Sequence, residues 1–107
     1  MTGDALYLVD LFKMQHDFFK TGMLDKGLRR DKFDRYSYSS WAINETLEAI
    51  KSWDGYLCVQ NIREILREQI GMYDMYYHAN ENTQERYKHA LNAVKYLYKL
   101  TEGYCYE

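Results

Sequence analysis

The chain has 107 residues, of which 47 % are hydrophobic and 28 % charged, with a formal net charge of −2. This length and composition predict one domain over residues 1–107, whose core needs no disulfide or metal to hold it together. The mildly acidic balance provides no overall positive field for nucleic acid or for an anionic membrane. There is no proline and β-branched residues are sparse, which favours helices.

The N-terminal stretch MTGDALYLVDLF lacks the basic region and the uninterrupted apolar core of a signal peptide. The apolar runs elsewhere are too short to span a membrane. We therefore expect a cytoplasmic protein without membrane contact. Cys58 and Cys105 are far apart in the sequence, and we expect both thiols to be reduced.

Helical periodicity predicts four amphipathic helices. The first covers residues 4–20. The second begins at Ser39 or Ser40, either of which could cap it, and is closed by Gly55. The third covers residues 56–78, and Gly71 inside it marks either a kink or a close helix crossing. The fourth covers residues 83–101, after which Gly103 ends the helix and the tail folds back against the bundle.

Short connections between the last three helices predict that neighbours in sequence run antiparallel. The fold class is therefore all-α, a small four-helix bundle with one long connection between the first and second helices, residues 22–38. A loop of that length is more often functional than accidental.

Four glutamates form a candidate metal site. Glu45 and Glu48 are three residues apart, and Glu64 and Glu68 follow on the next predicted helix. The E-x-x-E spacing resembles half of the motif of the all-α nucleotide pyrophosphohydrolases, which implies Mg²⁺ bound by paired acids. The other half, E-x-x-D, is missing, since Arg67 stands three residues after Glu64. A solvated helix face is the simpler interpretation.

Two acid–histidine pairs, Asp74 with His78 and Glu85 with His89, are spaced i,i+4 on the third and fourth predicted helices. Zinc tolerates such ligands, but no cysteine falls near them, so we expect polar surface residues and neither metal nor cofactor. The chain also lacks the sequence motifs of a nucleophile elbow or a phosphate-binding loop. The sequence predicts that the protein is not an enzyme.

A basic and aromatic stretch, RRDKFDRYSYSSW, covers residues 29–41. Arginines beside aromatic rings suit an acidic protein surface, phosphates or stacked bases. The acids within the stretch would repel phosphates, so nucleic acid is the less expected partner. A solvated connector remains an alternative. The candidate contact residues of this stretch are Arg29, Arg30, Lys32, Arg35, Tyr36 and Tyr38.

A second candidate surface is the hairpin between the third and fourth helices. Its tyrosines and methionines cover more than the single stripe that a monomeric bundle buries. Either the bundle encloses this end closely, or the surplus forms an interface with a protein partner or a second copy of the chain. The candidate residues are Tyr73, Tyr76 and Tyr77.

Together these features predict a non-enzymatic protein–protein interaction module. In its general character the chain is similar to small proteins of bacteriophages and mobile genomes. That resemblance implies a protein that binds and inhibits a host enzyme, such as a defence nuclease. Two alternatives stay open. One is a homodimeric helical transcription regulator or nucleic-acid-binding protein that uses residues 29–35, and the other is a metal-dependent nucleotide hydrolase that uses the four glutamates.

Overall fold

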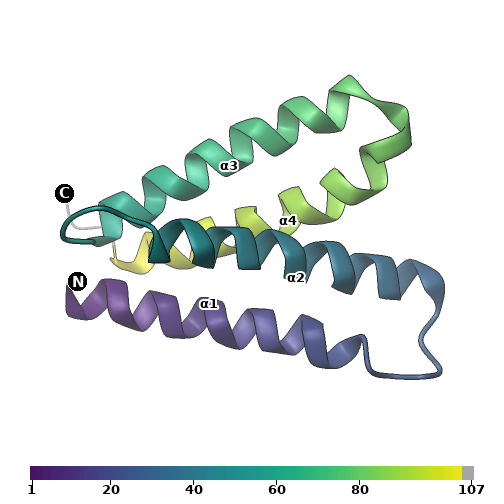
Figure 1. The fold of residues 1–107 in the computed structure, drawn as a ribbon, viewed down its shortest axis with the longest axis horizontal. Coiled ribbons are helices and arrows are strands. Elements are labelled where there is room, and N and C mark those ends of the chain that lie inside the picture. Colours follow the sequence, from purple (N-terminus) through teal and green to yellow (C-terminus); the bar gives the residue numbers. More distant parts are fainter. Residues whose placement is uncertain (105–107) are drawn as a thin grey trace.

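The computed structural model describes residues 1–104 and consists of four α-helices (Figure 1). These are α1 (Gly3–Gly22), α2 (Arg30–Lys51), α3 (Val59–Ala79) and α4 (Gln84–Thr101), with the 3-10 helices η1 (Glu81–Thr83) and η2 (Glu102–Tyr104) on either side of α4. No strand occurs in this part of the chain, so the predicted all-α bundle is confirmed. Cys58 is a free thiol. The predicted state of Cys105 and the fold-back of the tail from residue 105 lie outside the described residues.

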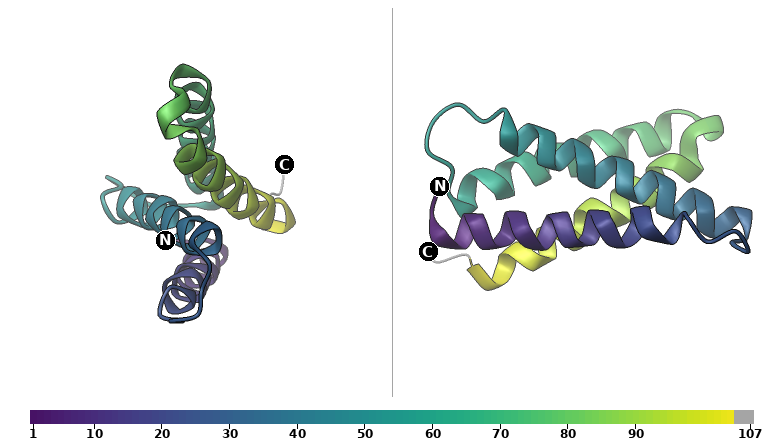
Figure 2. Two further views of the ribbon diagram at one scale, coloured as in Figure 1. Left: turned by 90° about the vertical axis from the view of Figure 1, so that its right-hand side faces the viewer. Right: turned by 60° about the horizontal axis from the view of Figure 1, so that its bottom comes forward.

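The bundle is built from two antiparallel hairpins, α1–α2 and α3–α4, which are joined by the packing of α4 on α2. Helix α2 packs against α4 much more extensively than against α3. Figure 1 shows α3 diverging from α2 towards the C-terminal end of α3, and Figure 2 shows α4 crossing obliquely between the two hairpins. Helices α2 and α3 therefore pack on each other less than either of them packs on α4.

One apolar stripe from each helix forms the core. The stripes follow the predicted 3.6-residue period, because a helix in a bundle buries only the face that meets its neighbours. The largest fully buried side chains are Phe12, Leu8, Ile43, Ile62, Leu66 and Leu97.

The predicted start of the second helix was wrong. Helix α2 begins at Arg30, so residues 30–38 are helical and the connection to α1 spans only residues 23–29. Ser39 and Ser40 are not caps but buried positions inside the helix, and the Ser40 hydroxyl donates to the Ser37 carbonyl oxygen at 3.2 Å. Because two small polar residues interrupt the apolar stripe, they resemble a helix start in the sequence.

A glycine allows the first turns of α2 to pack on α1. A Cβ atom at Gly22 would lie 2.7 Å from the ring of Tyr36, so only glycine accommodates this ring without a shift. The same ring lies 5.8 Å from Phe19 and 6.3 Å from Phe18, measured between ring centroids. These contacts extend the α1–α2 hairpin to its end and make residues 30–38 helical.

Helix α3 begins at Val59, and Cys58 precedes it as the N-cap residue. The Cys58 backbone N–H donates to Asn61 Oδ1 at 2.9 Å, and its thiol donates to the same oxygen at 3.0 Å. Cys58 is thus half-buried at the start of the helix.

A buried polar network links α2 to α3. The Thr46 hydroxyl lies 2.6 Å from Gln69 Oε1 and 3.2 Å from the Ala42 carbonyl oxygen, and Gln69 Nε2 donates to the Tyr73 hydroxyl at 3.2 Å. Thr46 is fully buried and Gln69 nearly so. Buried polar groups specify one packing arrangement when they are satisfied and are costly when they are not.

We predict that Thr46→Val destabilises the fold by about 1–3 kcal/mol, because the buried Gln69 Oε1 loses its donor while the side-chain shape is kept. Chemical denaturation monitored by circular dichroism measures the free energy of unfolding. Thr21→Val is the matched control, since Thr21 is exposed, and its effect should stay within about 0.5 kcal/mol. Equal effects at both positions would contradict the role given to the network.

A second prediction contrasts two helical glycines. Gly71→Ala should stabilise the protein by about 0.5–1 kcal/mol, because no atom lies within 4 Å of the added Cβ and alanine is the better helix former. Gly22→Ala should destabilise it, because the Tyr36 ring must move. Thermal unfolding of both variants tests the opposite signs. The open space at Gly71 also rules out the close helix crossing considered for it.

Candidate functional site

Aromatic side chains from three helices meet where α3 diverges from α2. The ring centroid of Trp41 on α2 lies 5.7 Å from that of Tyr73 on α3 and 6.3 Å from that of Tyr87 on α4. Tyr87 in turn lies 5.8 Å from Tyr73 and 5.2 Å from Tyr76. These distances fall in the range of favourable tilted and edge-to-face ring pairs. We call the following six residues the aromatic cluster: Tyr38, Trp41, Tyr73, Tyr76, Arg86 and Tyr87.

The aromatic cluster has a buried base and an exposed rim. Tyr73 is only 3 % exposed, whereas Trp41 and Tyr76 are each 37 % exposed. The rim rings are therefore held in place by packing and still present apolar area to solvent.

Tyr38 and Arg86 extend the cluster along α2 and α4. The Arg86 guanidinium carbon lies 5.6 Å from the centroid of the Tyr38 ring, a cation–π distance. The Tyr38 ring also stacks on His89 with a centroid separation of 6.4 Å, and His89 Nε2 lies 2.8 Å from Glu85 Oε1. A shallow depression of about 300 Å³ lies here, lined by Ser37, Tyr38, Trp41 and Arg86.

Of the candidate residues named from the sequence, the structure brings together Tyr38, Tyr73 and Tyr76. Arg29 and Arg30 stand in solvent at the start of α2, with side chains 79 % and 94 % exposed. Arg29 Nε lies 3.4 Å from a carboxylate oxygen of Asp31, and Arg30 Nε lies 4.0 Å from one of Asp34.

The other candidates lie apart from the cluster. Lys32 is exposed on the first turn of α2. Arg35 lines a groove between α1, α2 and α4. Tyr36 packs on α1, as described above, and Tyr77 contacts the ring of His78.

Sequence reasoning did not include Trp41, Arg86 and Tyr87 in the site. A signal for Tyr87 was present, because Tyr76 and Tyr87 each stand four residues from the connection formed by residues 80–83. Antiparallel helices place such residues opposite each other. No local signal brings Trp41 to this hairpin, since that contact depends on how α2 packs across α4.

The carboxylates do not assemble into a metal site. Within residues 1–104 no group of three or more His, Cys, Asp or Glu side chains is placed to hold a metal ion. Each acid–histidine pair makes its own contact, with His78 Nε2 3.6 Å from Asp74 Oδ1 and the His89–Glu85 contact given above. The donor set required by the hydrolase alternative is therefore not formed by the described residues.

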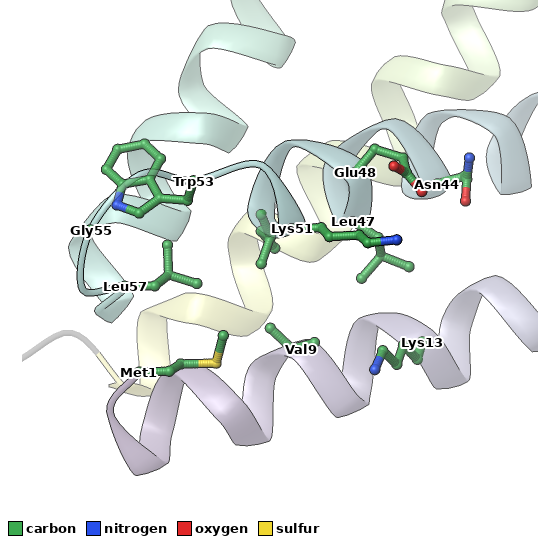
Figure 3. A pocket seen from close by; sticks show the side chains of 11 residues that line it. Met1, Val9, Lys13, Asn44, Leu47, Glu48, Lys51, Trp53, Gly55 and Leu57 are labelled. Atoms are coloured by element: carbon green, nitrogen blue, oxygen red, sulfur yellow. The ribbon is translucent and has the colours of Figure 1, made fainter.

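A depression of about 660 Å³ lies at the other end of the molecule between α1 and α2 (Figure 3). Its wall is mixed, with apolar side chains such as Val9, Leu47 and Leu57 and with Lys13, Glu48 and Lys51 along it. No His, Cys or Ser belongs to this lining, and Glu48 is its single carboxylate. The depression therefore offers neither a Ser–His or Cys–His pair nor a second acid for metal binding.

No protein-family model matches the chain, and no curated protein and no solved structure is significantly similar to it. Among the helices of residues 1–104, none combines the length and the apolar character needed to cross a membrane. Cytoplasmic location stays a prediction from the sequence.

Burial raises the pKa of the Tyr73 phenol above its ordinary value of 10.0, the hydrogen bond from Gln69 opposes this change, and the negative charge of Glu45 adds to it. The folded chain therefore keeps this proton at a pH where the unfolded chain has released it. It follows that stability contributed by Tyr73 is present below about pH 10 and is lost as the pH rises through the higher folded-state pKa.

We predict that the free energy of unfolding falls less steeply between about pH 8 and about pH 10.5 in Tyr73→Phe than in the natural chain. Urea denaturation at both pH values measures this. Tyr56→Phe is the control, because Tyr56 is 70 % exposed, and its pH dependence should match that of the unchanged protein. Identical slopes in all three chains would show that ionisation of Tyr73 does not limit alkaline stability.

Proposed function

We propose that the protein is a non-enzymatic interaction module that binds a protein partner through the aromatic cluster. The observation that supports this most directly is the rim of the cluster, where the exposed rings of Trp41 and Tyr76 both pack on Tyr87. The exposed Arg86 lines a depression together with Trp41. Tryptophan, tyrosine and arginine are the residues that most often dominate the binding energy of protein interfaces.

The packing of the rings favours affinity. Tyr87 contacts three other rings of the cluster, so these side chains have already lost most of their conformational freedom in the free protein. A partner that binds here does not have to order them, which lowers the entropic cost of association.

The chemistry of the rim also indicates the kind of partner. The depression beside Arg86 can receive an apolar side chain against Tyr38 and Trp41. Arg86 forms no ion pair within residues 1–104, so its charge is available to a carboxylate. A partner surface with an apolar residue next to an aspartate or glutamate satisfies both requirements. Inhibition of a host enzyme, such as a defence nuclease of a phage's host, is the specific role expected from the sequence and stays a prediction.

The nucleic-acid alternative receives less support from the positions of the arginines. Arg29 and Arg30 both stand beside aspartates, and Arg35 lies in a different groove. A phosphate backbone would have to displace or repel those acids, which weakens binding.

Site-specific photo-cross-linking tests the proposal. The photoreactive residue p-benzoylphenylalanine replaces Tyr76 in one chain and Tyr56, in the connection between α2 and α3 at the opposite end of α3 (Figure 1), in another. In the cells that make the protein, we expect one cross-linked protein partner from position 76 and none from position 56. Cross-links of equal yield from both positions, or none from position 76, would contradict the proposal.

A matched pair of charge reversals then tests the arginine. Arg86→Glu should weaken binding of the cross-linked partner by about tenfold or more, in the range of interface hot spots. Arg67→Glu makes the same change at an exposed position of α3 outside the cluster and should leave binding nearly unchanged. Isothermal titration calorimetry gives both affinities, and unfolding midpoints show that both variants are folded.

A further inference from the structure

A groove of about 500 Å³ lies where α1, α2 and α4 come together, and it shares no residue with the aromatic cluster. Ser39 of α2 and Ala93 of α4 line it although they are only 3 % and 6 % exposed, so the groove reaches down to the contact between these two helices. Sites for small molecules are typically concave, about 300–1,000 Å³ in volume and mostly apolar, with a few polar groups that orient the ligand. The groove has the size of such a site.

Positive charge gathers in this groove, although the chain as a whole has a formal net charge of −2. Arg35 of α2 and Lys88 of α4 both line it, and both are exposed. Neither forms an ion pair within residues 1–104. None of the described residues that line the groove is an aspartate or a glutamate. Both charges are therefore available to an anionic ligand.

Acidic residues near these two cations in the sequence have other partners. Asp31 and Asp34 each stand beside another arginine at the start of α2. Glu85 Oε1 lies 2.8 Å from Nε2 of His89, which is itself a lining residue of the groove. One carboxylate beside the groove against two unpaired cations leaves the groove with a net positive charge.

Aromatic rings also line the groove. Phe18 of α1 is 63 % exposed and Tyr96 of α4 is 47 % exposed. Contacts restrict the Phe18 ring, since its centroid lies 5.4 Å from that of Phe19 and 6.3 Å from that of Tyr36. An exposed ring that is held by its neighbours offers a stacking surface to a flat ligand.

Cations and amides stand at different levels of the groove. Helices α2 and α4 run in the same direction, and α1 runs in the opposite one (Figure 1). Arg35 and Lys88 belong to the earlier turn that α2 and α4 contribute, whereas Asn92 stands one turn later on α4. Gln15 comes from the earlier turn of α1, which the reversed direction places on the same side as Asn92. The groove is thus cationic towards one end and carries amides towards the other.

We infer that this groove binds a nucleotide, with the phosphate at Arg35 and Lys88 and the base stacked on an aromatic ring of the wall. A phosphate monoester carries close to two negative charges at neutral pH, which suits two cations from separate helices. The base is flat and stacks on rings such as that of Phe18. The amides of Gln15 and Asn92 can both donate to and accept from the polar edge of a base.

A single nucleotide suits the groove better than a nucleic-acid strand. Asp17 lines the neighbouring depression together with Phe18, and Glu85 stands beside His89 on the other side. The further phosphates of a strand would meet these acids, which weakens binding. The inference does not rest on the proposed function, since the two surfaces share no residue.

Isothermal titration calorimetry with the four nucleoside 5′-monophosphates tests the inference. At least one should bind with a dissociation constant of about 0.5 mM or below. Inorganic phosphate alone and the matching nucleoside should each bind at least about tenfold more weakly, because each makes only part of the contacts. If none of the four monophosphates reaches the stated affinity, the inference is wrong.

Substitutions locate the phosphate. Arg35→Gln and Lys88→Gln should each weaken binding of that monophosphate by about tenfold, because each removes a charged hydrogen-bond donor. Lys51→Gln is the matched control, since Lys51 is an exposed residue at the far end of α2, and it should leave the affinity nearly unchanged. Equal effects of all three substitutions would overturn the assignment, with circular dichroism showing that the variants are folded.

Two further measurements locate the base and exclude a strand. In nuclear magnetic resonance spectra, the side-chain amide signals of Gln15 and Asn92 should shift on addition of the monophosphate, whereas those of Asn61, which bonds to Cys58 at the start of α3, should not. Unmoved Gln15 and Asn92 signals would contradict the site. A single-stranded oligonucleotide that bound at least about tenfold more tightly than every monophosphate would identify a nucleic acid as the ligand and overturn the inference.

Discussion

The close packing of α2 on α4 governs the rest of the structure. Small buried side chains stand on both helices, namely Ser39 and Ala42 on α2 and Ala90 and Ala93 on α4. Helix axes approach one another more closely where the side chains between them are small. Since α4 lies along α3 as well and crosses obliquely, α3 cannot stay beside α2 over its whole length. The divergence of α3 from α2 is thus a consequence of the packing of a third helix.

Large aromatic rings pack between α2 and α3 where these two helices diverge. The buried Thr46–Gln69 contact holds α2 and α3 together near their middle, and beyond it Tyr73, Trp41 and Tyr87 pack as the helices separate. At the wide end the rings can no longer cover one another completely, so the outer ones are left partly exposed. The exposed aromatic area is therefore built into the geometry of the bundle, with a rigid support beneath it.

Most of the fold could be predicted from the sequence, because the apolar period and the turn residues are local signals. The error at α2 shows the limit of such signals. Ser39 and Ser40 have the side chains of helix caps, and only the approach of neighbouring helices makes them buried interior residues. Phe33 and Tyr36 continue the apolar period of α2 towards its N-terminus and so argue against a helix start at Ser39 or Ser40. That period could be recognised as helical only through the contact of the Tyr36 ring with Gly22 across the hairpin.

The candidate site could be predicted only in part, because its members come from three helices. Composition correctly marks tyrosine as unusually frequent, but it does not distinguish Tyr36, which packs on α1, from Tyr38, which faces α4. Two residues along a helix turn the side chain by about 200°, so the same aromatic stretch supplies one ring to the α1–α2 hairpin and another to the aromatic cluster. The rotation of α2 about its own axis relative to α4 decides which rings pack inside the bundle and which are exposed. That rotation is set by the packing of small residues between α2 and α4.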